Sequence, residues 1–190
     1  YALLEYLEHE RTRSINQDHY HAVFLIDLDQ FKAVNDAMGH AFGDKVIKAI
    51  ANRLAFNHRT EDFLGRLGGD EFVMVLSELE GKTQEAALQT YNNATAMQDL
   101  IKTPLKVDDQ QITLSASIGI TVFSYNSVHS SEDILRQADI ALYHAKDRGH
   151  GLFSFFQPEM QKKAQERVEQ ANELQSALKN KELLLKYQPQ

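Results

Sequence analysis

The stretch Phe63-Leu-Gly-Arg-Leu-Gly-Gly-Asp-Glu-Phe-Val-Met-Val-Leu76 decides the fold, because it predicts a β-hairpin with an acidic turn. Two strand-like apolar runs flank Gly68 and Gly69. Adjacent glycines suit a tight hairpin turn, since both tolerate positive φ. Asp70 and Glu71 then place two carboxylates at the tip of the hairpin. The sheet therefore contains at least one antiparallel pair, beside which the remaining elements can be placed.

Strands and helices alternate on both sides of this hairpin. Short or alternating apolar runs predict further strands at 22–28, at 112–122 with one buried face, and at 153–156. Apolar residues at three- and four-residue spacing predict helices at 1–18, 41–56, 84–101 and 130–146. On the third of these helices, the residues predicted to face inward are Ala87, Tyr91, Ala94, Met97 and Ile101.

The helix predicted at 130–146 has the clearest boundaries. Ser130 and Asp133 form a capping-box pattern at its start, and Gly149 follows its end. The order of the main elements is then β-α-β-β-α-β. This order predicts an α/β (α+β) fold of the ferredoxin-like kind, with a central mixed or antiparallel sheet flanked by helices.

Composition excludes several classes of protein. The chain has 190 residues, is 43% hydrophobic, contains no cysteine and carries a formal net charge of −7. The absence of cysteine excludes disulfides and thiolate metal sites and fits a cytoplasmic location. The acidic balance argues against nonspecific nucleic-acid binding. No apolar run approaches the roughly 20 residues of a membrane-spanning helix.

The ends of the chain indicate a piece of a longer protein. Tyr1 stands where an initiator Met would be expected, so a membrane anchor or sensor of the parent protein would lie outside this sequence. We predict a main domain over 1–157 and a charged linker helix over 158–182. Residues 183–190 read as the beginning of another domain.

Two groups of acids are candidates for chemistry. Asp27 and Asp29 end the strand predicted at 22–28, and Asp70 and Glu71 occupy the hairpin tip. Taken alone, each pair is more typical of turn acids that face solvent than of a site. If the two strands are neighbours, however, Asp27 and Asp70 meet, and Mg²⁺ prefers one or two carboxylates together with substrate phosphates. The glycines would leave room for a ligand to approach the backbone.

The sequence resembles the GGDEF family of diguanylate cyclases in five blocks that follow the family order. Arg66 to Phe72 matches the family signature in full. The other four blocks resemble the patterns D-x-D-x-F-K-x-x-N-D, G-H-x-x-G-D, S-x-G-[IV] and A-D-x-A-L-Y-x-A-K, and they lie at 27–36, 39–44, 117–120 and 138–146. The resemblance covers residues 22–150.

The resemblance implies the palm-like domain of nucleotide cyclases and the condensation of two GTP molecules into cyclic di-GMP and two pyrophosphates. It implies Mg²⁺, with Mn²⁺ as an alternative, bound by Asp27, the Leu28 carbonyl and Asp70. Glu71 would add negative charge there and help to deprotonate the attacking hydroxyl. The other residues implied to bind substrate are Phe31, Lys32, Asn35, Asp44, Gly68, Gly69 and Lys146.

Within that set, Asn35 and Asp44 would read the guanine edge, because an amide and a carboxylate together satisfy its donors and acceptors. Lys32 and Lys146 would lie near the phosphates. The family acts as a homodimer in which two GTP-loaded sites face each other.

A second site is implied by Arg59 and Asp62, which match the family's R-x-x-D product-inhibition motif five residues before Gly68. Arginine offers a planar fork to a guanine edge or a phosphate, and aspartate accepts from guanine N–H groups. Taken as an isolated tetrapeptide, the same pattern is usually a surface ion pair.

The sequence departs from the family pattern at two places. His150 stands where the family usually has an arginine that contacts the triphosphate, so a weaker and pH-dependent contact is expected. The family's D-x-L-T-G-L-x-N-R segment, which completes the guanine pocket, is absent.

The tail from Glu173 to Gln190 resembles the opening of an EAL phosphodiesterase domain, which implies a GGDEF–EAL tandem parent. Two functions remain open: an active diguanylate cyclase, or a non-catalytic GGDEF module that binds GTP or cyclic di-GMP and regulates the attached phosphodiesterase.

Overall fold

The computed structural model describes residues 2–13, 19–56, 59–124 and 129–162, together with Glu173 and Ala177. The chain divides into two compact units, Tyr1–Phe156 and Gln157–Gln190. Residues 158–162 of the second unit are helical. Apart from residues 158–162, Glu173 and Ala177, the predicted linker helix and the predicted EAL opening lie outside the described residues, so these boundaries remain predictions.

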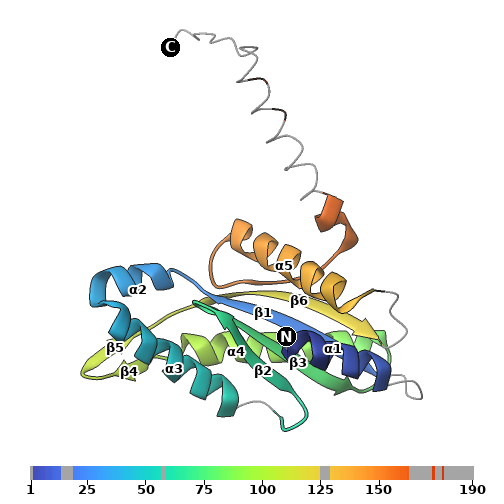
Figure 1. Cartoon of the computed structure of the whole chain (residues 1–190), viewed down its shortest axis with the longest axis horizontal. Coiled ribbons are helices and arrows are strands. Elements are labelled where there is room, and N and C mark those ends of the chain that lie inside the picture. The colour runs from blue at the N-terminus through green and yellow to red at the C-terminus, as the bar shows by residue number, and fades with distance from the viewer. Residues whose placement is uncertain are drawn as a thin grey trace. The chain divides into compact units, whose positions relative to one another are not determined.

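The first unit is built on a five-stranded sheet in the order β2-β3-β1-β6-β7 (Figure 1). Its strands are β1 (Tyr20–Leu28), β2 (Phe63–Gly68), β3 (Glu71–Leu79), β6 (Ala116–Ser124) and β7 (Phe153–Phe155). All neighbouring pairs are antiparallel except β6 and β7, which are parallel. The predicted hairpin is therefore confirmed as β2–β3, and it lies beside β1.

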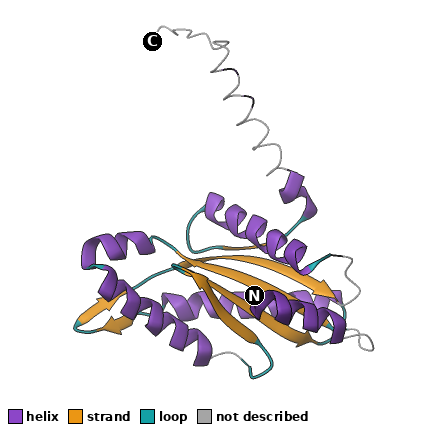
Figure 2. Cartoon of the chain, viewed as in Figure 1, coloured by secondary structure: helices purple, strands orange, loops and turns teal. Residues whose placement is uncertain are grey.

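Helices cover both faces of this sheet (Figure 2). On one face, α3 (His40–Phe56) and α4 (Thr83–Lys102) bury their apolar residues against Phe24, Ile26 and other residues of the larger core. On the other face, α1 (Ala2–Arg13) and α5 (Ser131–Arg148) pack against Val23, Leu25 and their neighbours. Successive residues of β1 point to opposite faces, so its continuous apolar run is explained by burial on both sides.

The predicted fold class is confirmed: a mixed α/β domain with a mostly antiparallel central sheet flanked by helices. The boundaries of α5 also follow the sequence. Ser130 caps its first turn by accepting from the Asp133 amide, and Gly149 ends it with a φ of 132°.

The strand predicted at 112–122 is wrong in two respects. Residues 110–112 form β5 (Gln110–Ile112), which pairs with β4 (Leu105–Val107) in a separate small hairpin, and β6 begins only at Ala116. β6 is also buried on both faces, because Ser117 and Thr121 on the polar side of the alternation lie under α5 and are 0% and 2% exposed. The polar residues of β6 are small and lie beneath a closely packed helix. In the sequence they give the same apolar–polar alternation as a strand with one face exposed to solvent.

The predicted inner face of α4 is also partly wrong. Ala94, Met97 and Ile101 are buried as expected, but Tyr91 is 52% exposed and the buried positions nearer the N-terminus are Ala86 and Thr90. Tyr91 instead packs edge-on against Phe153 of β7. None of the described helices combines the length and the apolar character required to cross a bilayer.

Candidate active site

The predicted acids meet at one end of the sheet. Asp27 near the end of β1 is directly opposite Glu71 at the start of β3. The amide of the next residue, Leu28, donates to the Asp70 carbonyl oxygen at 3.3 Å. Figure 1 shows the hairpin tip beside the end of β1 and close to the start of α2 (Phe31–Met38). Antiparallel pairing, rather than loop geometry, therefore brings the two acidic groups together.

The hairpin tip is open to solvent and fixed from within. Gly68 and Gly69 have φ values of 155° and 52°, and a Cβ at either position would meet no atom within 4 Å. The Nε and Nη2 atoms of Arg66 donate to the Gly69 carbonyl at 3.0 and 2.7 Å. A ligand could thus approach the turn closely while Arg66 holds its shape. No role for Arg66 was predicted from the sequence, although an arginine three residues before a turn carbonyl suits this contact.

Lys146 occupies the space next to Asp27. Its Nζ lies 2.7 Å from Asp27 Oδ2, and the two side chains are 37% and 14% exposed. Partial burial raises the pKa of the Asp27 carboxyl above its ordinary value, whereas the hydrogen bond and the charge of Lys146 lower it. The negative charges of Asp70 and Asp29 add to the upward effect of burial on this pKa. The acids are therefore close enough to influence one another.

The donor set at this end of the sheet fits a hard divalent cation. The carboxylates of Asp27 and Asp70 and the backbone carbonyl of Leu28 are oxygen ligands, which Mg²⁺ and Mn²⁺ prefer. Within the part of the chain that the structure describes, no three Asp, Glu or His side chains cluster tightly enough to hold a metal by themselves. Mg²⁺ commonly completes its coordination with water and substrate phosphates, so two carboxylates are enough protein ligands for it.

The residues predicted to read guanine are neighbours on α2 and α3. Asn35 lies against Gly43 so closely that a Cβ on that glycine would be 1.9 Å from Asn35 Oδ1. Asp44, the next residue, is exposed. Phe31 also packs on Gly43 and is only 7% exposed, so its ring supports this surface from below. The missing side chain of Gly43 thus leaves room for the Asn35 amide next to the residue that precedes Asp44.

If Asn35 reads guanine as predicted, replacing Gly43 with alanine should raise the KM for GTP about tenfold, because the new methyl group must push the Asn35 amide out of place. The helix itself should persist, since Asn35 is a half-buried side chain that can move outward. Steady-state kinetics of Gly43→Ala, Asn35→Ala and the double variant measure this. Because both changes act through the same amide, the double variant should resemble the singles; fully additive losses would contradict the assignment.

Asp29 has a different role from its neighbour Asp27. It is 6% exposed, and its carboxylate accepts hydrogen bonds from Ser115 Oγ at 2.5 Å, Ser117 Oγ at 2.6 Å and the Gly151 amide at 2.7 Å. The Gly151 carbonyl in turn accepts from Gln98 Nε2 of α4 at 2.9 Å. Asp29 therefore fastens the turn after α5 to the end of β1, and this contact between distant segments left no local sequence pattern.

The same turn positions His150. Its Nδ1 lies 3.1 Å from Asp29 Oδ1, and its side chain is 58% exposed. The imidazole is therefore held beside the site by a buried carboxylate while its other edge faces outward. Lys32, the remaining basic candidate, is exposed on the first turn of α2.

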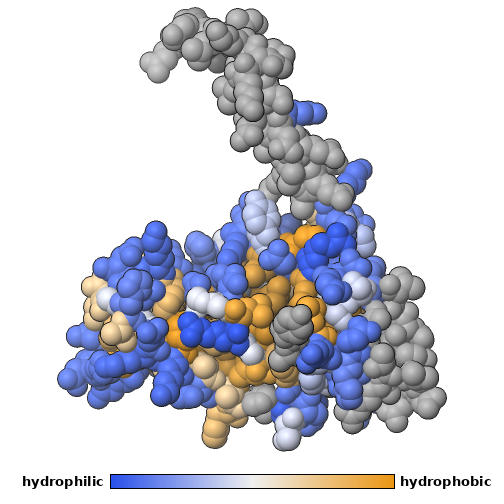
Figure 3. Space-filling view, in the orientation of Figure 1, coloured by the Kyte–Doolittle hydropathy of each residue, from blue (hydrophilic) through white to orange (hydrophobic). Residues whose placement is uncertain are grey.

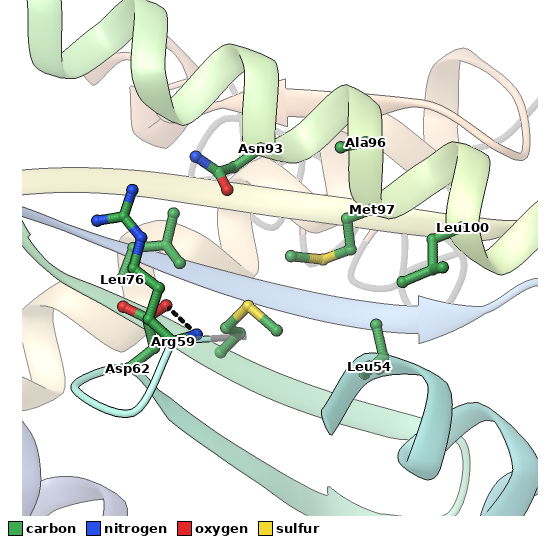
Figure 4. A pocket seen from close by; sticks show the side chains of 9 residues that line it. Leu54, Arg59, Asp62, Leu76, Asn93, Ala96, Met97 and Leu100 are labelled. Carbon is green, nitrogen blue, oxygen red and sulfur yellow. Dashed lines mark hydrogen bonds between the residues drawn. The ribbon is translucent and has the colours of Figure 1, made fainter. Parts of the chain in front are cut away.

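Arg59 and Asp62 lie at the opposite end of the hairpin from the acidic tip, just before β2. Asp62 is 8% exposed and accepts from the backbone amides of Arg59 at 3.1 Å and Ser77 at 3.2 Å. Both residues border a cavity of about 190 Å³ between β3, α3 and α4. Figure 4 shows the Arg59 side chain extending towards the helix that carries Asn93.

A second hollow lies on the other face of the sheet, beside α1 and α5. It measures about 330 Å³, is lined mainly by leucines, and has Glu71 at its edge. Figure 3 shows apolar side chains gathered across the middle of this face. The hollow adjoins the acidic tip. Besides Glu71, the polar residues that line it are Arg136 and Asp139.

The fold is a palm-like α/β domain that brings three carboxylates, a glycine turn and a lysine together at one end of its sheet. A family model described as "Diguanylate cyclase, GGDEF domain" matches residues 1–151. The chain belongs to the GGDEF family.

Named relatives agree with this assignment. The chain is 37% identical over 186 residues to the bifunctional diguanylate cyclase/cyclic di-GMP phosphodiesterase MucR of Pseudomonas aeruginosa, covering 96% of this chain and 26% of MucR. It is 34% identical over 167 residues to the cyclic di-GMP phosphodiesterase PdeR of Escherichia coli, covering 88% of this chain and 24% of PdeR. The chain thus spans about a quarter of the length of these two relatives.

Solved structures give the same result for the fold. The crystal structure of the GGDEF domain of YfiN, also called TpbB, from Pseudomonas aeruginosa superposes with a TM-score of 0.69 at 30% identity. The match covers 82% of this chain and 91% of that domain.

Proposed function

We propose that this domain is an active diguanylate cyclase, which condenses two GTP molecules into cyclic di-GMP and releases two pyrophosphates. The observation that carries the proposal is the direct pairing of Asp27 with Glu71 and of Leu28 with Asp70, beside an open glycine turn and Lys146. These are the groups that a nucleotidyl transfer requires, and they converge at one end of the sheet.

Asp27, Asp70 and the Leu28 carbonyl would hold the divalent cation, which would stabilise charge on the phosphoryl oxygens when bound. The open turn at Gly68 and Gly69 leaves room for the triphosphate. Asn35 and Asp44 would fix the guanine, because adenine would leave their hydrogen-bonding groups unpaired.

In the chemical step, the 3′-oxygen of one GTP attacks the α-phosphorus of the other, and the bond to the pyrophosphate breaks. Glu71, exposed and opposite Asp27, is placed to accept the proton of the attacking hydroxyl. Each domain binds one GTP, so the reaction requires two domains related by a two-fold axis with their sites facing each other.

The direct test incubates the purified protein with GTP and Mg²⁺ and follows cyclic di-GMP and pyrophosphate by liquid chromatography and mass spectrometry. Two pyrophosphates should appear for each cyclic di-GMP. Bound GTP without either product would instead support the regulatory function described next.

A second candidate function is a non-catalytic GGDEF module that binds GTP or cyclic di-GMP and regulates an attached EAL phosphodiesterase. Its support is the tie between His150 and Asp29, which holds an imidazole where the family usually has an arginine. The name of PdeR, a phosphodiesterase that shares this domain, gives it further support. The bifunctional name of MucR supports a GGDEF–EAL parent for either function.

We also propose product inhibition through Arg59 and Asp62. Replacing Arg59 with alanine should allow synthesis to continue at cyclic di-GMP concentrations that stop the wild type, and should weaken product binding at least tenfold, because a charge-assisted fork is lost. Arg59 is the cleaner probe, since Asp62 is buried and holds two backbone amides. Progress curves and calorimetric titration with cyclic di-GMP measure the effect.

The control for this change is Lys106→Ala, which removes an exposed positive charge from β4. Equal product affinity in Arg59→Ala and the wild type would place the inhibitory site elsewhere.

A further inference from the structure

Lys146 forms an ion pair with Asp27, one of the two carboxylates that the proposed function assigns to a divalent cation. Lys146 Nζ is within hydrogen-bond distance of Asp27 Oδ2, at 2.7 Å, and Asp27 is largely buried while Lys146 is about one-third exposed. A partly buried carboxylate is costly to leave uncompensated. In the protein without ligands, the ammonium group therefore serves as the counter-charge of Asp27.

The ammonium and a divalent cation compete for the same carboxylate. A cation bound to Asp27 would place two positive charges within a few ångströms of Lys146 Nζ, and like charges at that separation repel strongly in a partly buried site. Lys146 must then give up its contact, or the cation binds only weakly.

The backbone that carries Lys146 is not free to retreat. Lys146 lies in the last turn of α5, and its carbonyl accepts from the Gly149 amide at 3.2 Å. Two residues after Gly149, the Gly151 amide donates to Asp29 and the Gly151 carbonyl accepts from Gln98. The exchange is therefore confined to the long, partly exposed lysine side chain, which can rotate while its Cα stays fixed.

We propose that Lys146 is an exchange residue: its ammonium neutralises Asp27 in the empty site, yields that carboxylate to the divalent cation, and moves to the triphosphate that arrives with the cation. This inference rests on the proposed function. It makes cation and nucleotide binding mutually dependent, because the nucleotide supplies the anion that the displaced ammonium needs. A cation alone is disfavoured, so the site loads metal and nucleotide together.

The test measures Mn²⁺ binding without nucleotide, using the electron paramagnetic resonance signal of free Mn²⁺, in the wild type and in Lys146→Met. Methionine preserves much of the length of the side chain and its helix propensity but removes the charge. We expect Lys146→Met to bind Mn²⁺ alone about three- to tenfold more tightly. It should bind 3′-deoxy-GTP, which lacks the attacking hydroxyl, about tenfold more weakly at saturating Mn²⁺.

The matched control is Lys106→Met, which removes one exposed positive charge from β4 and should leave both affinities unchanged. A further variant, Asp27→Asn, distinguishes failure of the metal assignment from failure of the exchange role of Lys146. If Asp27→Asn leaves Mn²⁺ binding unaltered, the metal assignment of the proposed function is wrong. If Asp27→Asn weakens Mn²⁺ binding but Lys146→Met does not tighten it, or if neither the wild type nor Lys146→Met binds Mn²⁺ alone, the exchange role is overturned.

Discussion

Replacing Asp70 with asparagine is expected to lower the rate of cyclic di-GMP synthesis about a thousandfold. Asparagine has nearly the same shape, and the hydrogen bond from the Leu28 amide goes to the backbone carbonyl of residue 70, so the hairpin should keep its pairing with β1. What is lost is one of the two carboxylates proposed to hold the cation against the triphosphate. Initial rates of product formation at saturating GTP and Mg²⁺ measure the loss.

The matched control for this variant is Asp109→Asn, which removes an exposed carboxylate from the turn between β4 and β5. It should retain the wild-type rate, since it changes the net charge by the same amount on a hairpin that is not part of the five-stranded sheet. Turnover by Asp70→Asn within a few-fold of the wild type would remove this carboxylate from the chemistry.

Replacing Gly119 with alanine is expected to destabilise the domain by about 3 kcal/mol or more, which lowers the melting temperature by about 10 °C. A Cβ at this position of β6 would lie 2.1 Å from the Ala138 carbonyl oxygen and 2.3 Å from the Leu142 amide nitrogen. Both atoms belong to the backbone of α5, which cannot yield as a side chain would. The helix must move away from the sheet, taking Lys146 with it.

Gly65→Ala is the control for this steric argument. On β2 the nearest atoms to an added Cβ are side-chain carbons of Phe63, at 3.0 and 3.3 Å, and of Val73, at 3.4 Å, and these can shift slightly. Thermal unfolding followed by circular dichroism should show a small effect for Gly65→Ala and a large one for Gly119→Ala. Similar melting temperatures for the two variants would mean that α5 does not pack on Gly119 as described.

The elements with strong local patterns could be predicted from the sequence. The hairpin followed from Gly68 and Gly69, whose φ values are both positive. The expected turn position is wrong by one residue, since Gly68 ends β2 and the two turn residues are Gly69 and Asp70. The start of α5 followed from Ser130 and Asp133, whose side chains form the predicted capping box. In each case the responsible interaction lies within a few residues of the chain, so short-range pattern and structure agree.

Elements set by distant contacts were harder to predict. The short helix α2 was not foreseen, although Phe31 and Val34 have helical spacing, because only eight residues separate Gln30 from Gly39. The inner face of α4 was misplaced near its N-terminus because alanine gives little contrast between buried and exposed positions: Ala86 is buried, whereas the predicted Ala87 is exposed.

Some contacts of the candidate site could likewise be predicted from the sequence, and others could not. The meeting of Asp27 and Asp70 followed from the expectation that their strands are neighbours, and the pairing of β1 with β3 bears this out. The ion pair of Lys146 with Asp27 and the hydrogen bonds of Asp29 join residues more than 80 positions apart. Only the folded chain displays them.

The most direct test of the account is the position of a metal ion in crystals grown with Mn²⁺ and 3′-deoxy-GTP, located by anomalous scattering at the manganese edge. We expect a peak between the carboxylates of Asp27 and Asp70, next to the Leu28 carbonyl, with the triphosphate beside it and Lys146 no longer on Asp27. A bound nucleotide whose manganese lies away from both carboxylates, with the Lys146–Asp27 pair intact, would contradict it.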